Sequence, residues 1–288
     1  MHSPTAACPT SRSLPFEPSD AAATQENGAP RTFGRLSGRV VPVAALADAQ
    51  RRSMFALLCR YFAGVQQAQF EQDLAEKDSV ILLADSEGET LAGFSTLMAF
   101  RAEVDGQPVV AFFSGDTVID RDYWGETALP RLWAQNVFGR ALQIRDARAY
   151  WFLICSGYKT YRFLPVFFRE FYPTYARPTP PAEQRLLDTL GRRKFPEGYD
   201  PACGVVRLAH GAALRPGVAE IDAQRLADPH VAFFQAANPG HARGDELACI
   251  TELTLDNLTP AGRRMLGLRA HPRGAVCAPA GRDLASAG

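Results

Sequence analysis

Residues 109–172 alternate between buried strands and helices, and this alternation constrains the fold more than any other feature of the 288-residue chain. Val109–Asp120 predicts a long apolar strand that ends in charge, and a turn then leads into a helix within Arg121–Ala147. Ala149–Gly157 predicts a second buried strand, followed by an aromatic helix at Tyr158–Tyr172. Each strand delivers the chain to a helix N-terminus, where backbone N–H groups lack partners and an anion is favoured. The stretch therefore predicts a ligand cleft between two strands.

The residues before this stretch predict an antiparallel meander. Turns that contain Asp and Gly separate Ser79–Ala84, Thr90–Arg101 and the long strand. A short strand at Arg39–Val43 and an amphipathic helix at about residues 49–66, capped by Asp48, precede them.

We divide the chain into four parts by composition. Residues 1–34 are rich in Ala, Pro, Ser and Thr without an apolar period and are expected to be disordered. Residues 35–175 form the predicted core, and residues 176–269 form a C-terminal extension that packs on it and begins with a helix at Pro181–Phe195. Residues 270–288 are expected to be a loose tail.

Composition and charge exclude several classes of protein. A formal net charge of zero argues against a nucleic-acid binder. We find neither an apolar run long enough to span a bilayer nor a signal peptide, so we expect a cytoplasmic protein. The six cysteines are scattered without a C-x-x-C pair, and we therefore expect no metal site. Residues 109–172 contain no histidine, so their chemistry must use carboxylates, hydroxyls, a thiol, Lys, Arg or water.

The order strand, two helices, three meander strands, turn, helix, strand, helix resembles the GNAT superfamily of acyltransferases. The resemblance covers about Arg39–Tyr172 and rests on the order of elements. It implies an α/β fold with a mixed, mostly antiparallel sheet flanked by helices. It also implies that the long strand and its neighbour splay apart, and that the pantetheine arm of an acyl thioester lies between them. In this chain the backbone of Thr117, Val118 and Ile119 would pair with that arm.

In that family a Q/R-x-x-G-x-G/A turn cradles the CoA pyrophosphate with backbone N–H groups. The corresponding residues here keep Arg121 and Gly125, whereas Thr127 replaces the second glycine. Asp122 and Glu126 would repel a diphosphate, so a donor with one phosphate, such as phosphopantetheine on an acyl carrier protein, is an alternative to acyl-CoA. The residues expected to bind the donor outside the strand are Arg121, Trp124, Gly125, Thr127, Lys159 and Arg162.

Lys159 and Arg162 enter this group because both lie in the first turn of the aromatic helix. Cations there oppose the helix dipole, so they indicate either a nearby anion or simply solvated charges.

Asp116 is the candidate general base, because it interrupts an apolar strand beside Gly115. A glycine within a strand often marks a bulge, and a bulge can turn a side chain toward a cleft. Burial would raise the pKa of Asp116 and prepare it to accept a proton. Ser114, two residues away, is a candidate for orienting the substrate. The alternative is an Asp116 satisfied by local hydrogen bonds or an arginine.

The resemblance places Thr160 and Phe167 where the family has an Asn and a general-acid Tyr. Tyr158 and Tyr161, one turn earlier, are therefore the candidate acids.

Cys155 ends the second strand just ahead of a helix and Lys159, a setting that would lower a thiol pKa. It is a candidate nucleophile, with Ser156 a weaker one, and the alternative is a small buried hydrophobe. The aromatic side chains of residues 163–172 are expected in the core, or some of them along an acyl tunnel. The polar loop Asn238–Glu246, which contains His241, is either a surface loop or a cover over the cleft.

These observations predict an acyltransferase that moves an acyl group from a CoA or carrier-protein thioester to an amine or hydroxyl of a small-molecule acceptor by direct attack. Two alternatives remain at this point. One is a non-catalytic module that keeps the fold to bind a ligand or partner, and the other is a thioesterase that depends on Cys155.

Overall fold

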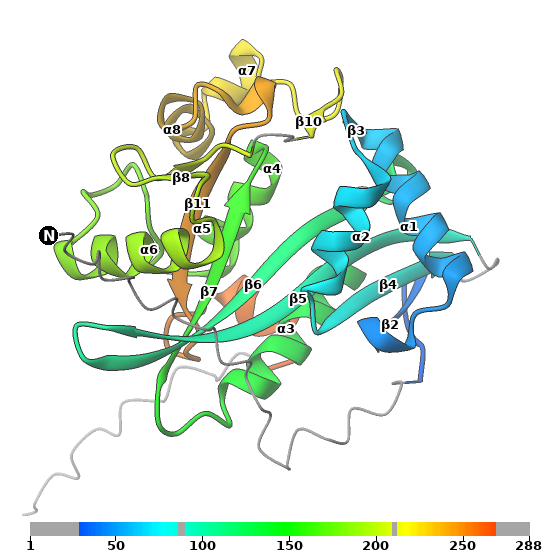
Figure 1. The fold of residues 1–288 in the computed structure, drawn as a ribbon, viewed down its shortest axis with the longest axis horizontal. Helices are drawn as coiled ribbons and strands as arrows, with labels where there is room; N and C mark the ends of the chain where they lie inside the picture. The colour runs from blue at the N-terminus through cyan, green and yellow to red at the C-terminus, as the bar shows by residue number, and fades with distance from the viewer. Residues whose placement is uncertain (1–28, 86–89, 209–211, 269–288) are drawn as a thin grey trace, which may run out of the picture.

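A computed structural model describes residues 29–85, 90–208 and 212–268, and its centre is a nine-stranded sheet (Figure 1). The strands, in order across the sheet, are β1 (Arg31–Phe33), β2 (Leu36–Pro42), β4 (Ser79–Asp85), β5 (Leu91–Val104), β6 (Gln107–Ile119), β7 (Arg148–Cys155), β11 (Glu246–Glu252), β9 (Val205–Val206) and β8 (Tyr199–Asp200). All neighbours pair antiparallel except β6 and β7, which are parallel. The expected fold class, an α/β fold with a mixed and mostly antiparallel sheet flanked by helices, is confirmed.

Helices cover both faces of the sheet, as the alternation along β6 requires. Val109, Ala111 and Phe113 pack toward α6 (Pro181–Lys194), whereas Val110 and Phe112 share the opposite core with α3 (Ala128–Ala141). The other helices on the α6 face are α1 (Asp48–Tyr61) and α2 (Gln67–Ala75). The other helices that contribute to the α3 core are α4 (Tyr158–Tyr161), α5 (Phe163–Phe167), α8 (Pro229–Ala237) and α9 (Pro260–Met265).

Three smaller elements complete the described chain. The strands β3 (Phe62–Ala63) and β10 (Ala213–Leu214) pair antiparallel as a separate ribbon. The short helix α7 (Ala223–Leu226) precedes α8, and its N-cap Asp222 accepts a hydrogen bond from the Arg225 N–H at 2.8 Å. None of the described helices is long and apolar enough to cross a membrane.

The predicted bulge at Gly115 is confirmed. The register between β5 and β6 pairs Leu97 with Ser114 and Ser95 with Thr117, so Gly115 and Asp116 together oppose the single residue Thr96. Only glycine fits at position 115, because an added Cβ would lie 2.6 Å from Thr96 Oγ1. The bulge bends β6 at the point where it carries Asp116.

The parallel pair β6 and β7 separates just before this bulge. Pairing runs from Val109 opposite Arg148 to Ser114 opposite Leu153 and then stops, although β6 continues to Ile119. On its other edge β7 stays paired with β11 as far as its last residue, Cys155 opposite Leu247. The two strands therefore diverge, and the β7-facing edge of β6 beyond Ser114 has no strand partner among the described residues.

The prediction of one continuous aromatic helix at Tyr158–Tyr172 is wrong. The chain forms α4, bends at Arg162 and forms α5, which ends at Phe167. Pro165 lacks the N–H that would continue the ladder from α4 into α5. After α5 the chain is extended, with isolated bridges from Phe168 to Leu258 and from Tyr172 to Ile250.

Two further expectations need correction, and both concern helix or strand ends. Arg31–Phe33 was placed in the N-terminal tail but forms β1, which returns to β2 through a turn with Gly34 at φ +61°. Asp48 is the first residue of α1 rather than its cap, and the Gln50 side chain accepts the Ala47 N–H at 3.0 Å. The expected tails at residues 1–28 and 270–288 lie outside the described residues.

Candidate active site

A cavity of about 830 Å³ lies where β6 and β7 diverge. Its walls fall into three groups of residues, which come from different elements. The turn region contains Trp124, Gly125, Glu126, Thr127, Gly157, Lys159 and Val218. The aromatic chamber contains Leu129, Trp133, Ala134, Phe138, Trp151, Leu153, Phe163, Phe167, Phe168, Leu258, Gly262 and Met265. The charged region contains Gln66, Gln69, Asp73, Glu76, Lys77, Asp116, Lys194 and Glu246.

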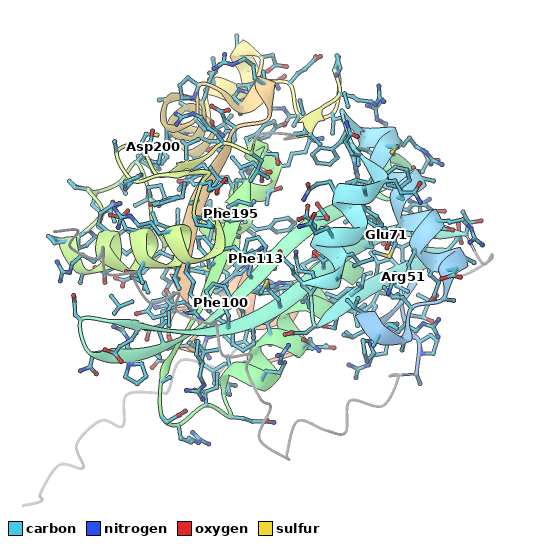
Figure 2. All side chains as sticks on the ribbon, in the orientation of Figure 1. Arg51, Glu71, Phe100, Phe113, Phe195 and Asp200 are labelled. Carbon is cyan, nitrogen blue, oxygen red and sulfur yellow. The ribbon has the colours of Figure 1, made fainter. Side chains whose placement is uncertain are left out.

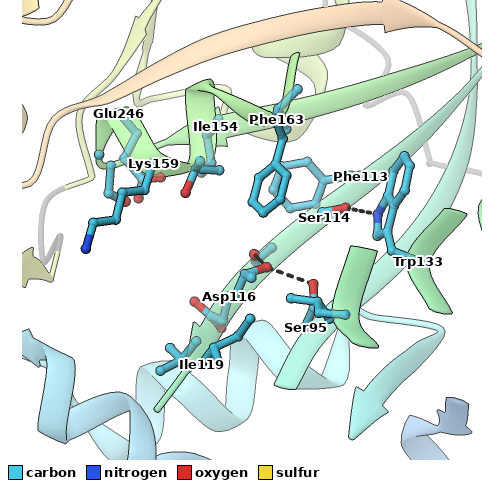
Figure 3. A pocket seen from close by; sticks show the side chains of 18 of the residues that line it. Ser95, Phe113, Ser114, Asp116, Ile119, Trp133, Ile154, Lys159, Phe163 and Glu246 are labelled. Carbon is cyan, nitrogen blue, oxygen red and sulfur yellow. Dashed lines mark hydrogen bonds between the residues drawn. The ribbon is translucent and has the colours of Figure 1, made fainter. Parts of the chain in front are cut away.

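Asp116 projects from the bulge of β6 into the charged region (Figure 3). Burial raises the pKa of its carboxyl group, the positive charge of Lys77 lowers that pKa and the negative charge of Asp73 raises it. Lys77 is only 8% exposed, and its Nζ donates to the Asp73 carbonyl oxygen at 2.7 Å. Burial lowers the pKa of Lys77. The region thus holds a partly desolvated acid next to a partly desolvated base.

Aromatic rings pack against the lysine side chains of the charged region. Phe113 on β6 and Phe195 after α6 meet edge to face with ring centroids 5.8 Å apart (Figure 2). Lys194 Nζ lies 5.6 Å from the Phe113 centroid and 5.2 Å from the Phe195 centroid. These contacts hold the lysine beside the cavity.

Glu246, the first residue of β11, is a site residue that the sequence analysis missed as an acid–base group. Burial raises the pKa of its half-buried carboxyl group to about 7, with a smaller upward contribution from the charge of Asp116. The Ser156 hydroxyl donates a hydrogen bond to it, which acts in the opposite direction. Figure 3 shows both carboxyl groups in the same cavity, Glu246 at the start of β11 and Asp116 on β6. The sequence placed Glu246 only in a polar loop, because nothing local indicates that β11 pairs with β7.

Ser114 has a structural task in this arrangement. Its Oγ accepts hydrogen bonds from Trp133 Nε1 at 2.8 Å and from Trp151 Nε1 at 3.0 Å. The two indole rings lie 4.2 Å apart, so one buried hydroxyl orients both at the entrance to the aromatic chamber.

The turn region differs from a free N–H cradle. The N–H groups of Asp122, Tyr123, Trp124 and Glu126 already donate within the turn, at 3.0–3.3 Å. Gly125, at φ +99°, has the left-handed backbone that favours glycine. Thr127 is the N-cap of α3, but its side chain makes no capping hydrogen bond.

Trp124 occupies the end of β6 that was expected to hold a pantetheine arm. Its Nε1 donates to the Ile119 carbonyl oxygen at 3.0 Å. Lys159 Nζ lies 3.3 Å from the centroid of the Trp124 ring and donates to the Val218 carbonyl at 2.6 Å. Arg121 also approaches this ring, at 5.2 Å, and donates to the Gly217 carbonyl. These three side chains join β6, α4 and the segment around Val218 at one end of the cavity.

The remaining predicted donor residues divide between the cavity and the core. Thr117 lines the cavity, and its Oγ1 lies 2.7 Å from Ser95 Oγ. Val118 lines the cavity and also packs in the core beneath α1 and α2. Arg162 is not a cavity residue and instead pairs with Asp228 at 3.2 Å.

Tyr158, Tyr161 and Cys155 are buried and do not line the cavity. The Tyr161 hydroxyl donates to the Pro173 carbonyl at 3.0 Å. The expected lowering of the Cys155 thiol pKa is wrong, because burial and the neighbouring Cys249 raise it well above its ordinary value. Among the described residues, no group of three or more His, Cys, Asp or Glu side chains is arranged to hold a metal ion.

Comparison with known proteins gives a local structural likeness. No family model and no curated protein sequence matches the chain. One similar solved structure is that of a conserved protein of unknown function, a probable N-acyltransferase, from Enterococcus faecalis. The two sequences are 16% identical, and the TM-score is 0.35 for an alignment that covers 46% of this chain and 33% of that one. A second is a GNAT family N-acetyltransferase from Escherichia coli in complex with CoA. It is 17% identical to this chain, and the TM-score is 0.33 for an alignment that covers 47% of this chain and 71% of that one.

A third structure, a GCN5-related N-acetyltransferase from Kribbella flavida, is 15% identical with a TM-score of 0.34 over 48% of this chain and 35% of that one. The chain therefore spans only about a third of the length of the first and third of these proteins.

Proposed function

We propose that the protein transfers an acyl group from a thioester to an amine of a small-molecule acceptor. The observation that carries this proposal is the pair Asp116 and Glu246 beside the unpaired edge of β6, where β6 and β7 diverge. An open strand edge offers N–H and C=O groups to an amide-containing arm. The two carboxyl groups supply a base next to the same space.

The donor arm would lie along Gly115–Ile119, with its thioester carbonyl near the bulge. Because the N–H groups of residues 122, 123, 124 and 126 already have partners, a diphosphate would find fewer donors there than in the family pattern. We therefore keep both donors in the proposal, acyl-CoA and an acyl chain on the phosphopantetheine of a carrier protein. Lys159 and Arg121 would attract the single phosphate of the second donor, since both lie at the turn end of the cavity.

Glu246 is the better general base, because a pKa of about 7 matches neutral conditions. Asp116 would hold the acceptor as an ammonium ion, which releases one proton to solvent and becomes a neutral amine. The amine nitrogen then attacks the thioester carbonyl, the C–N bond forms, the C–S bond breaks, and Glu246 accepts the proton lost by nitrogen. Ser156 would protonate the departing sulfur and recover its own proton from Glu246. Because Cys155 lies outside the cavity, we propose direct attack without a covalent intermediate.

Turnover with octanoyl-CoA and with octanoyl carrier protein across a panel of amines tests this proposal. Replacing Glu246→Gln should lower kcat about 10²–10⁴-fold and remove the acid limb near pH 7 from the kcat/KM profile. Glu252→Gln, on the same strand but outside the cavity, is the matched control. The Cys155→Ala variant should turn over as fast as the wild type. Wild-type turnover by Glu246→Gln would contradict the assignment of the base.

A non-catalytic binding module is the second candidate. Two observations favour it. Backbone N–H groups at residues 122, 123, 124 and 126 already have partners, and the Trp124 indole N–H already donates a hydrogen bond to the Ile119 carbonyl oxygen. Absence of turnover with both donors across the amine panel would support this candidate over the transferase.

A further inference from the structure

We infer that the aromatic chamber holds a medium to long apolar acyl chain, and that the donor is therefore a fatty acyl thioester rather than an acetyl thioester. This inference rests on the proposed function and names the donor class for the same site.

The cavity to which the chamber belongs is larger than protein packing leaves by accident. Interiors are close-packed and contain few voids wider than a water molecule. The whole cavity measures about 830 Å³, within the range of sites that enclose small ligands. An acetyl group would occupy only the part beside β6 and would leave the chamber empty. Apolar space of this kind is filled favourably by an apolar ligand.

Ring contacts link the aromatic residues that line the chamber one after another. Trp133 and Trp151 stand at its entrance, fixed by Ser114. Phe168 follows, with its ring 5.8 Å from that of Trp151, and Phe138 stacks on Phe168 at 6.3 Å. Met265, the last residue of α9, also lines the cavity, and we place the far end of the chamber there. A chain that enters beside Asp116 would therefore lie along successive aromatic walls.

The chamber walls offer an apolar chain no competing polar groups. Both indole N–H groups are used by the Ser114 hydroxyl, and none of the residues that define the chamber is charged. The charges of the cavity gather on the other side of β6, around Lys77 and Glu246. This separation matches a donor with an apolar tail and an acceptor with a charged amine.

The end of the chamber is closed by α9, which belongs to the C-terminal part of the chain. Thr259, the N-cap of α9, donates through its N–H to the Phe167 carbonyl at 3.0 Å and through its hydroxyl to the Val166 carbonyl at 2.6 Å. A Cβ on Gly262 would lie 2.4 Å from the Phe167 oxygen, so glycine permits this close approach. The helix is thus held against α5 as a wall of the chamber.

Binding of S-alkyl phosphopantetheine thioethers with ethyl, butyl and octyl chains tests this inference by calorimetry. These compounds cannot be transferred, and their arm is common to both donors. Burial of one methylene tightens binding by about fourfold at most. We expect at least about a tenfold gain from butyl to octyl. Met265→Trp, which fills the chamber end, should remove most of that gain and leave the ethyl compound unchanged.

Arg264→Trp adds the same side chain at the neighbouring exposed position, which does not line the chamber, and should keep the gain. Equal affinity for all three chains in the wild type, or a gain that survives Met265→Trp, would overturn the inference. Acetyl transfer without any chain-length preference would contradict the chamber assignment but leave the transferase proposal standing. A chain-length gain without acyl transfer to any amine would support the chamber and contradict the transferase.

Discussion

The chemistry of single residues in this site is set by which charges and walls surround them. Glu246 and Asp116 are both carboxyl groups with pKa values raised by burial, yet Lys77 counteracts the shift only at Asp116. Glu246 has the Ser156 hydroxyl instead of a cation. Glu246 therefore suits the exchange of a proton near neutral pH, whereas Asp116 lies in the field of a neighbouring cation.

Replacing Glu246→Gln should stabilise the fold at alkaline pH. The pKa of Glu246 rises from 4.5 in the unfolded chain to about 7 in the folded protein, so between these values the folded state retains a proton that the unfolded state releases. Wild-type stability therefore falls, relative to the variant, as pH rises from 4.5 to 7. We expect the variant to be more stable by about 1–3 kcal/mol at about pH 8 and equal at about pH 4, as measured by urea unfolding.

Glu252→Gln is again the control, because Glu252 pairs with Arg148 at 2.9 Å and its loss should be neutral or slightly destabilising at about pH 8. If Glu246→Gln instead destabilised the protein at about pH 8, the contacts of the ionised carboxylate, such as the hydrogen bond from Ser156, would outweigh the cost of burying its charge.

Interruptions of regular backbone hydrogen bonding end two elements beside the cavity and determine its shape. The bulge at Gly115 bends β6, and the pairing of β6 with β7 stops one residue earlier, at Ser114. Pro165 separates α5 from α4, which lets Phe163 and Phe167 face the aromatic chamber. A longer, regular helix in this position would carry a different set of aromatic side chains toward the core.

Two glycine substitutions test the packing of the helices that form the chamber. Gly262→Ala should destabilise the protein by about 1–3 kcal/mol, because its Cβ meets a backbone oxygen at 2.4 Å that cannot move without shifting α5. Gly139→Ala, at an exposed position of α3 with no atom within 4 Å, should stabilise it by about 0.5–1 kcal/mol through helix propensity. Thermal unfolding of both variants checks the pair, and equal effects would argue against the close contact of α9 with α5.

At the scale of the whole molecule, the sheet joins segments that are far apart in the chain. The strand β11, from the C-terminal part, lies between β7 and β9 and pairs with both. It brings Glu246 to the cavity, and α9 then closes the aromatic chamber. The residues after 175 therefore complete both the sheet and the site.

A chain that ends at Asp228 should fail to form the native core. It would lack α8, β11 and α9, expose the edge of β7 and remove buried side chains that include Phe234, Leu247 and Ile250. The near-UV circular dichroism of Trp133 and Trp151, which reports their fixed packing, should be lost. A truncated protein with wild-type near-UV signal and melting temperature would show that the chain up to Asp228 folds without α8, β11 and α9.

Local features were predictable because they depend on neighbours along the chain. The alternation of apolar residues located β4, β5, β6 and β7, and the glycine within an apolar strand located the bulge. Asp105 and Gly106 both take positive φ angles in the expected hairpin turn. Among site residues, Asp116 was found in this way, since a carboxylate in an apolar strand is a local signal.

Contacts between distant groups depend on the folded arrangement of the entire chain. The meander, the bulge and the order of strand and helix around them follow from local sequence, because hydrogen-bonding period and backbone sterics act over a few residues. The pairing of β11 with β7 places Glu246 at the cavity and Cys155 out of it, and the shared bonds to Ser114 join Trp133 to Trp151. Such contacts follow from burying the apolar surface of the entire chain at once, so no short segment encodes them.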